Sequence, residues 1–275
     1  INFLVQNKKK VFFDAEHFFD GYKEDPETSL KILDAVISTK VECFVFCDTN
    51  GGTLPSEVHE IISEIISKYP KANFGVHFQN DNGCAVANSM VAVDLGVNHV
   101  QGTINGYGER TGNADLCTLI PNLTLKKGYQ TISERSLGQL TQTANHIAEL
   151  VNVAIDSRHP YVGSSAFTHK AGLHASGMAK DSSLYEHIDS AAVGNFTRTT
   201  VSELAGRASV LTKAEEFGLE FNNDDAKKLI EEVQNLEHMG YQFEAADGSL
   251  FILMNKLKNI EPNFFKFESF RVFSE

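Results

Sequence analysis

Polar side chains of the kinds that bind metal ions or move protons follow four short apolar segments of the chain. The segments span 11–16, 43–48, 74–78 and 99–104. They are rich in Val and Phe and recur at the spacing of a strand plus its return helix, which predicts a parallel sheet. Parallel strands gather their sites at their carboxyl ends, so we expect these side chains to lie along one edge. Helix capping explains some of the Asp and Asn residues but not Glu16 or His77. The set includes Asp14, Glu16, His17, Asp48, Thr49, Asn50, His77, Gln79, Asn80, Asp81, Asn105, Glu109, Arg110 and Asn113.

His77 and Gln79 are two residues apart on a predicted strand, so both side chains face the same way. Together with Asn113 in the following loop, they could bind one metal ion. A single histidine at a strand end is otherwise an ordinary hydrogen-bonded residue, and the pattern leaves both interpretations open. The nearby glycines, Gly106, Gly108 and Gly112, do not have the spacing of a dinucleotide-binding loop.

Composition limits the classes of partner. The chain has 275 residues, with 24 Lys and Arg against 36 Asp and Glu, a formal net charge of −12. That charge disfavours nucleic acids and anionic membranes as partners, and no apolar run approaches the length of a membrane span, so we expect a soluble protein. Four scattered cysteines indicate neither disulfides nor a zinc ribbon, which favours the cytoplasm.

The remaining elements are predicted from helix caps and apolar periodicity. Helices are expected from Pro26, capped by Asp25, then around 58–66, and over 85–95 before Gly96. One long helix is expected from Ser133 to Val151, a loop-rich stretch over 157–210, and a helix from Asn222 or Asn223 to Gly240. The tail over 263–275 alternates aromatic and polar residues like a strand. We therefore predict three parts, 1–132, 133–210 and 211–275.

Several stretches resemble the isopropylmalate, homocitrate and citramalate synthase family of the DRE-TIM metallolyase superfamily. They read VFFDAEHFFDGYK, CDTNGGTLP, HFQNDNGCAVANS, QGTINGYGERTGNADLCTLIPNL and HKAGLHASGMAKDSSLYEHI. The wording is most similar to the citramalate synthase branch. The resemblance implies the C-terminal half of a TIM (β/α)8 barrel followed by mainly helical linker subdomains. It also implies an acyltransferase of branched-chain amino acid biosynthesis that condenses acetyl-CoA with a 2-oxo acid and releases CoA.

The same resemblance implies roles for particular residues. His77, Gln79 and Asn113 match metal ligands, and Gln79 stands where the family has a second histidine. This exchange shifts the preference among Zn, Mn and Mg toward the harder ions. Glu16 matches a carboxylate beside the substrate, and Thr49 with Asn50 matches the part that binds the 2-oxo acid. His174 and Tyr185 match a pair that reaches the neighbouring subunit's active site and helps to enolise the acetyl group, which implies a homodimer.

Three functions remain open at this point. The first is the condensing synthase, with isopropylmalate and homocitrate synthases as variants because the motifs do not fix the 2-oxo acid. The second is a catalytically inactive structural or assembly module, since the chain carries no Arg-Asp pair of the family's first strand and has Gln79 in place of histidine. The third is a related aldolase or lyase, against which the segment containing His174 and Tyr185 argues. We expect the isolated chain to be at best feebly active.

Overall fold

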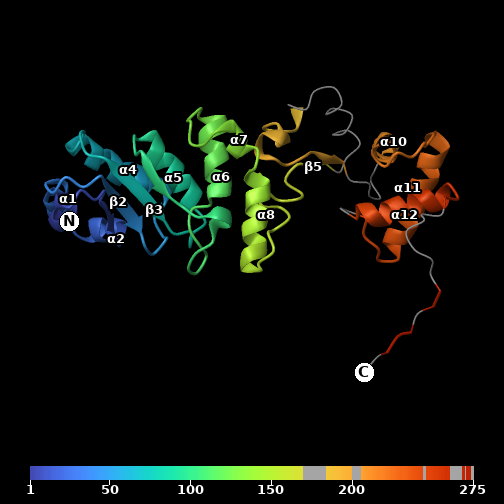
Figure 1. Cartoon of the computed structure of the whole chain (residues 1–275), viewed down its shortest axis with the longest axis horizontal. Helices are drawn as coiled ribbons and strands as arrows, with labels where there is room; N and C mark the ends of the chain where they lie inside the picture. The colour runs from blue at the N-terminus through green and yellow to red at the C-terminus, as the bar shows by residue number, and fades with distance from the viewer. Residues whose placement is uncertain (170–183, 200–205, 244–245, 261–267, 270, 274–275) are drawn as a thin grey trace. The chain divides into compact units, whose positions relative to one another are not determined.

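The structure is a computed structural model that describes residues 1–169, 184–199, 206–243, 246–260, 268–269 and 271–273 (Figure 1). The chain forms two compact units, Ile1–Gly163 and Ser164–Glu275. The division into three parts at 132 and 210 stays a prediction. Among the helices of the described ranges, none is long and apolar enough to span a membrane.

The first unit is built on a four-stranded parallel sheet in the order β1-β2-β3-β4, which confirms the predicted α/β class. The strands are β1 Phe12–Ala15, β2 Cys43–Asp48, β3 Phe74–Phe78 and β4 His99–Gln101. The helices that connect them are α2 Phe18–Glu24, α3 Pro26–Ile37, α4 Pro55–Lys68 and α5 Ala85–Asp94, and a short helix, α1 Asn2–Gln6, precedes the sheet. Helices connect consecutive strands, and all four strands run in the same direction. Their carboxyl ends therefore lie along one edge of the sheet.

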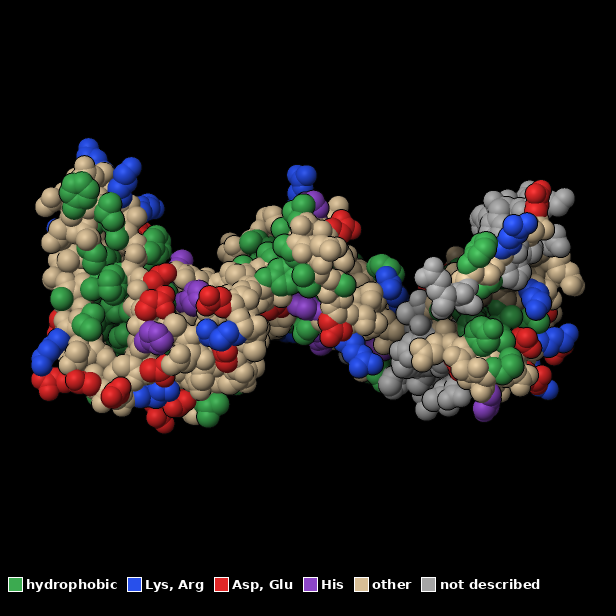
Figure 2. All heavy atoms as spheres, turned by 90° about the horizontal axis from the view of Figure 1, so that it is seen from below, with side chains coloured by type: hydrophobic (Ala, Val, Ile, Leu, Met, Phe, Trp, Pro, Cys, Tyr) green, Lys and Arg blue, Asp and Glu red, His purple; other side chains and the backbone are tan. Residues whose placement is uncertain are grey.

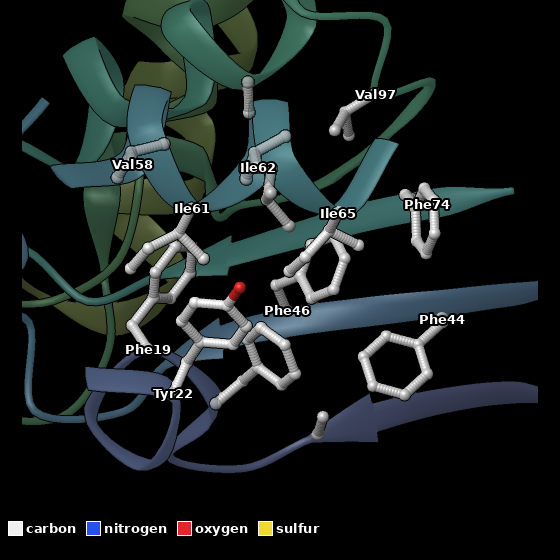
Figure 3. Packing of buried hydrophobic residues seen from close by; sticks show 14 of the residues in the cluster. Phe19, Tyr22, Phe44, Phe46, Val58, Ile61, Ile62, Ile65, Phe74 and Val97 are labelled. Carbon is white, nitrogen blue, oxygen red and sulfur yellow. The ribbon is translucent and has the colours of Figure 1, made fainter. Parts of the chain in front are cut away.

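One face of the sheet carries the core of this unit. Phe44, Phe46, Phe74, Val76 and Phe78 are buried there against the helices. Figure 3 shows the apolar side chains of α2 and α4 packed over β2 and β3. Each such side chain contributes roughly 1.5–3 kcal/mol when it leaves water, so burial of this face stabilises the unit.

The opposite face carries small and polar side chains. Cys43, Val45 and Cys47 form a separate buried cluster on β2. Partners in the parallel register point to the same face, which places Asp14 beside Val45 and His77 beside Cys47. Burial raises the pKa of the Cys47 thiol to about 12, so this cysteine is a packed residue rather than a nucleophile.

Local capping chemistry sets the helix starts as the sequence predicts. Asp25 accepts a hydrogen bond from the Thr28 N–H at 3.0 Å, and Pro26 occupies the first turn of α3. A hydrogen bond with the Thr28 side chain, followed by this N–H bond, lowers the pKa of the Asp25 carboxyl. Gly96, two residues beyond α5, has a φ of +104°, which a glycine adopts readily.

The prediction of one long helix from Ser133 to Val151 is wrong. The structure has two helices instead, α7 Glu134–Leu137 and α8 Leu140–Val151. Gly138 ends the first, and Gln139 leaves the helical region with φ −104° and ψ 3°. Glycine is a poor residue for a helix interior because it loses more backbone entropy than any other residue, and here it marks the break.

Before α7 the chain forms η1 Ile104–Gly106, α6 Leu116–Pro121 and the π-helical turn η2 Asn122–Lys126.

The second unit contains short strands and a helical core. The pair β5 Thr168–His169 and β6 Arg198–Thr199 is parallel, and η4 Ser190–Val193 lies between them in sequence. The core is formed by α10 Arg207–Glu216, α11 Asn223–His238 and α12 Asp247–Leu257. Asn222 caps α11 by accepting hydrogen bonds from two N–H groups at 2.9 Å, which confirms the predicted start. Of the tail predicted as a strand, 263–267, 270 and 274–275 lie outside the described residues, and the rest forms no strand.

Candidate active site

The carboxyl edge of the parallel sheet gathers most of the polar side chains that the sequence singled out. Figure 2 shows histidines among acidic and basic side chains on the surface of the amino-terminal unit. Two groups of contacts lie along this edge. One joins the ends of β1 and β2, and the other joins the end of β3 to the loop after β4.

His77, Gln79 and Asn113 come together at the end of β3. The Asn113 Nδ2 atom lies 3.0 Å from His77 Nε2 and 3.0 Å from Gln79 Oε1. Asn113 is buried, while His77 and Gln79 are half-buried. The three side chains that the sequence proposed as metal ligands therefore converge on one point.

The loop over 106–113 brings Asn113 to this position by pairing with the end of β3. The Asn80 N–H donates to the Gly112 carbonyl at 2.9 Å, and Gln79 and Asn113 form a β-bridge. Gly112 has a φ of +91°, and a Cβ there would lie 1.9 Å from the Gly106 carbonyl oxygen. A Cβ on Gly108 would lie 2.1 Å from Asn113 Oδ1. The glycines of this loop thus allow a close approach of backbone to Asn113, a different use from cradling a dinucleotide.

This geometry suits one side of a cation site. Hydrogen-bond donors and cations both bind to lone pairs of electrons. The lone pairs of His77 Nε2 and Gln79 Oε1 both point to the Asn113 amide, so a cation placed there could bind both atoms. If that amide turns about its axis, its oxygen replaces its nitrogen and completes a set of one imidazole and two amide ligands. All three ligands are neutral, and the described residues contain no cluster of three His, Cys, Asp or Glu that could hold a metal ion. The set therefore fits part of the shell of a divalent ion, with a preference for hard ions.

Glu16 and Thr49 meet at the ends of β1 and β2. The Thr49 hydroxyl donates to Glu16 Oε2 at 2.7 Å and accepts from the His17 N–H at 2.8 Å. His17 has a φ of +58°, so the chain turns sharply after β1 and leaves Glu16 exposed to solvent. The neighbouring Asn50 donates its Nδ2–H to Asp20 at 2.7 Å. The edge thus presents an exposed carboxylate beside a hydroxyl.

Arg110 connects the two groups of contacts, a role that the sequence interpretation missed. Its guanidinium binds both carboxylate oxygens of Asp81, at 2.7 and 2.9 Å, and donates to the Thr49 carbonyl at 2.8 Å. The bond from Arg110 holds the pKa of the Asp81 carboxyl below its usual range. Only the planar guanidinium of an arginine can bind both oxygens of a carboxylate in this way. The presence of an arginine in this loop was therefore the feature of the sequence that could have indicated the contact.

Gln101 is the second residue that the sequence interpretation missed. Its Oε1 lies 2.8 Å from His77 Nδ1, and its Nε2 donates to Asp14 Oδ1 at 3.0 Å. In the strand register Gln101 is the partner of His77, so the two side chains point to the same face. The available signal was the position of Gln101 within the fourth predicted strand, which the structure ends at this residue.

The pair His174 and Tyr185 belongs to the part of the chain after the first unit. His174 lies outside the described residues. Tyr185 belongs to the second unit, where 43% of the residue is exposed. Their predicted catalytic roles stay predictions.

Two family models match successive parts of the chain. The HMGL-like family model matches residues 4–147, and the model described as homocitrate synthase post-HMGL domain-like matches residues 161–240. The solved HMG-CoA lyase from Bacillus subtilis is similar to this chain with a TM-score of 0.50 and 20% identity, over 57% of this chain and 55% of that one. At this identity, the similarity shows the fold alone.

Relatives with longer chains match nearly all of this sequence. The (R)-citramalate synthases of Aquifex aeolicus and Geobacter sulfurreducens are 47% and 44% identical to it, over 99% and 100% of this chain and 52% of each relative. The 2-isopropylmalate synthase of Cronobacter sakazakii is 30% identical over 98% of this chain and 53% of its own. The chain spans about half the length of these relatives. By the match over more than half of its residues, the chain belongs to the HMGL-like family.

Proposed function

We propose that this chain carries part of the active site of an enzyme that condenses acetyl-CoA with a 2-oxo acid and releases CoA. The observation that carries the proposal is the convergence of His77, Gln79 and Asn113 at the same sheet edge as Glu16 and Thr49. Such a condensation needs a cation to polarise the acceptor carbonyl and a base to take a proton next to the thioester. This edge offers groups suited to both tasks.

Pyruvate is the 2-oxo acid that we propose, which makes (R)-citramalate the product after the thioester is hydrolysed. Support comes from five relatives named (R)-citramalate synthase, which are 40–47% identical over almost the whole chain, while one named putative (R)-citramalate synthase is 31% identical. The relatives named 2-isopropylmalate synthase are 30–31% identical. The larger identity favours the citramalate branch.

His77, Gln79 and Asn113 would hold a divalent ion, and Mg or Mn suits their donors better than Zn does. When bound, the ion would supply a positive charge that polarises the carbonyl of the 2-oxo acid. His77 Nε2 and Gln79 Oε1 already aim at one point. The contribution of Asn113 is its amide oxygen, which requires the amide to turn.

Thr49 and Glu16 would bind the 2-oxo acid and handle a proton. Thr49 has one hydroxyl hydrogen, which it now donates to Glu16. A substrate carboxylate competes for this hydrogen, since a hydroxyl donates only once. When Thr49 turns to the substrate, the Glu16 oxygen loses its donor and becomes free to accept a proton. Asn50, next to Thr49, would contribute its amide to the same substrate contacts.

The roles of His174 and Tyr185 belong to the same proposal. Together they would help to remove a proton from the acetyl methyl group. The electron pair left on its carbon would form a bond with the carbonyl carbon of the 2-oxo acid, while the π pair of that carbonyl moves to its oxygen, which takes up a proton. Water then attacks the thioester carbon and the CoA thiol leaves with a proton. We also propose a homodimer in which this pair serves the partner's site, acting in the cytoplasm in branched-chain amino acid biosynthesis.

A chimera tests the proposed activity. It joins this chain to the portions of the Aquifex aeolicus relative that the chain does not span, and it is assayed with acetyl-CoA and pyruvate for thiol release and for citramalate by mass spectrometry. We expect pyruvate-dependent turnover in the range of roughly 1–1,000 per second, slower turnover with bulkier 2-oxo acids, and a loss of about 100-fold for Glu16→Gln. The Aquifex protein assayed alongside is the control.

The same chimera separates the proposal from its alternative, a catalytically inactive module. Gln79 favours that alternative, because its amide is a weaker ligand than imidazole. If the chimera is inactive while its Gln79→His variant is active, the chain is an inactive module. Activity of the unaltered chimera excludes the module.

A further inference from the structure

Asp14, Gln101 and His77, on the face of the sheet opposite the core, form a chain of hydrogen bonds that ends at a proposed metal ligand, His77. Gln101 donates from Nε2 to Asp14 Oδ1 at 3.0 Å, and its Oε1 lies 2.8 Å from His77 Nδ1. Asp14 is on β1 and Gln101 on β4, the first and last strands of the sheet. The chain of bonds therefore crosses the whole face.

The chemistry of the first member sets the direction of the whole chain. A carboxylate accepts hydrogen bonds and cannot donate them. Gln101 must therefore turn its NH2 group toward Asp14, which leaves its carbonyl oxygen toward His77. That oxygen also only accepts, so the hydrogen of the neutral imidazole must be on Nδ1, and Nε2 keeps its lone pair.

In the present orientation of the Asn113 amide, the contact on the other side of the ring fits the same tautomer. The Asn113 Nδ2 group lies 3.0 Å from His77 Nε2, and an N–H donor at this distance needs a lone pair on Nε2. Two independent partners, one for each ring nitrogen, therefore agree.

We propose that Asp14 and Gln101 are positioning residues that hold His77 as the Nδ1–H tautomer, with the Nε2 lone pair directed at Gln79 and Asn113. The tautomer follows from the hydrogen bonds alone, while its use in binding a cation rests on the function proposed above. Histidines that bind metals through Nε2 commonly donate from Nδ1 to a carbonyl or carboxylate, which fixes ring orientation. Here an amide serves as that acceptor, and a carboxylate orients the amide in turn.

The tautomer can be read without any metal or activity. The 275-residue chain is labelled with 15N in its imidazole rings, and the His77 signals are assigned with a His77→Asn variant. We expect His77 to be mainly the Nδ1–H tautomer. In Asp14→Asn the side chain at position 14 can donate as well as accept, so Gln101 is free to turn and the Nε2–H tautomer should become a substantial fraction. Gln101→Leu, which removes the acceptor, should have a similar effect.

Two further variants separate positioning from a general structural effect. Gln101→Glu keeps an acceptor for Nδ1–H and should retain the Nδ1–H tautomer. Asp20→Asn removes a carboxylate from the same edge that bonds Asn50 and not Gln101, and it should leave the His77 signals unchanged. His99, on the same strand as Gln101 but outside the bond chain, is an internal reference in each spectrum.

The inference is overturned if His77 is mainly Nε2–H in the unaltered chain. It is also overturned if Asp14→Asn and Gln101→Leu both leave His77 as Nδ1–H. Titration with Zn2+ and Mn2+ follows as a separate measurement in the same sample. An Nδ1–H tautomer that responds to both variants, but with no response of His77 to metal, supports the positioning role and counts against the proposed metal site.

Discussion

The two faces of the parallel sheet differ in composition, although every strand contributes to both. On the helix-covered face, Phe44 and Phe46 are fully buried among other aromatic rings, with centroids 4.7–5.6 Å from that of Phe18. On the opposite face, Gly75 leaves room for the ring of His99, and His77 forms a hydrogen bond with Gln101. Side chains on the first face are held by apolar packing, while those on the second face are held by directed hydrogen bonds.

This difference shows how one strand serves stability and chemistry together. Successive residues point to opposite faces, so a strand can hold a core residue and a ligand side by side without conflict. Phe78 is buried in the core between His77 and Gln79, which turn toward Asn113. Substitutions on the two faces should accordingly differ in what they change.

Phe46→Ala should give the largest effect. It removes a fully buried ring that contacts Phe18, Phe44 and Phe74, and the loss of stability should be about 3–5 kcal/mol. Urea unfolding followed by circular dichroism measures it. Phe12→Ala, on the other face where Phe12 is 45% exposed, is the matched control and should cost less than about 1 kcal/mol. Equal losses at both positions would remove the contrast between the faces.

Gly108→Ala should disturb the site more than the fold. The added Cβ meets Asn113 Oδ1, so Asn113 must move away from His77 and Gln79 at a cost of about 1–3 kcal/mol. The shift of the His77 ring signals reports the movement. Gly52→Ala, where the new Cβ meets nothing within 4 Å, is the control. His77 signals that stay unchanged in Gly108→Ala would mean that the loop does not position Asn113.

Gln79→His should raise the affinity for zinc more than that for magnesium, by about tenfold or 1.4 kcal/mol, because imidazole suits the softer ion. Calorimetric titration of both proteins with both ions measures this, and the effect should be larger in the chimera with the Aquifex relative. Gln130→His adds an exposed histidine away from the site and controls for unspecific binding. Undetectable zinc binding before and after the change would mean that His77, Gln79 and Asn113 form no metal site.

Arg110→Ala should have the smallest effect, on acid titration. The pKa of Asp81 is lowered in the folded chain, so its bond with Arg110 stabilises the fold above the unfolded-state pKa, about 3.9. That contribution is lost as the pH falls through the lowered folded pKa. The substitution should raise the pKa of Asp81 toward the usual range, which carboxyl 13C NMR measures between pH 2 and 6. Lys31→Ala, which removes the exposed partner of Glu27, should leave the Asp81 titration unchanged.

Local sequence patterns were sufficient to predict much of the architecture. The apolar segments, the caps at Asp25 and Asn222 and the recurrence of strand and helix depend on neighbours a few residues away. Such short-range relations can be identified from the sequence without a structure. The grouping of polar residues at the strand ends followed from the same pattern, because the carboxyl ends of parallel strands share one edge. The break at Gly138 was missed because apolar periodicity continues on both sides of it.

The contacts that orient the site depended on strand register and loop path, which no local pattern records. Gln101 meets Asp14 across 87 residues of sequence, and Arg110 meets the Thr49 carbonyl across 61. A shift of register by one residue would turn Gln101 to the opposite face and break its bond with His77. The sequence by itself therefore determined the types of these residues. Their hydrogen-bond partners, and with them the tautomer of His77, were decided by the tertiary structure, because helix packing holds the four strands in register.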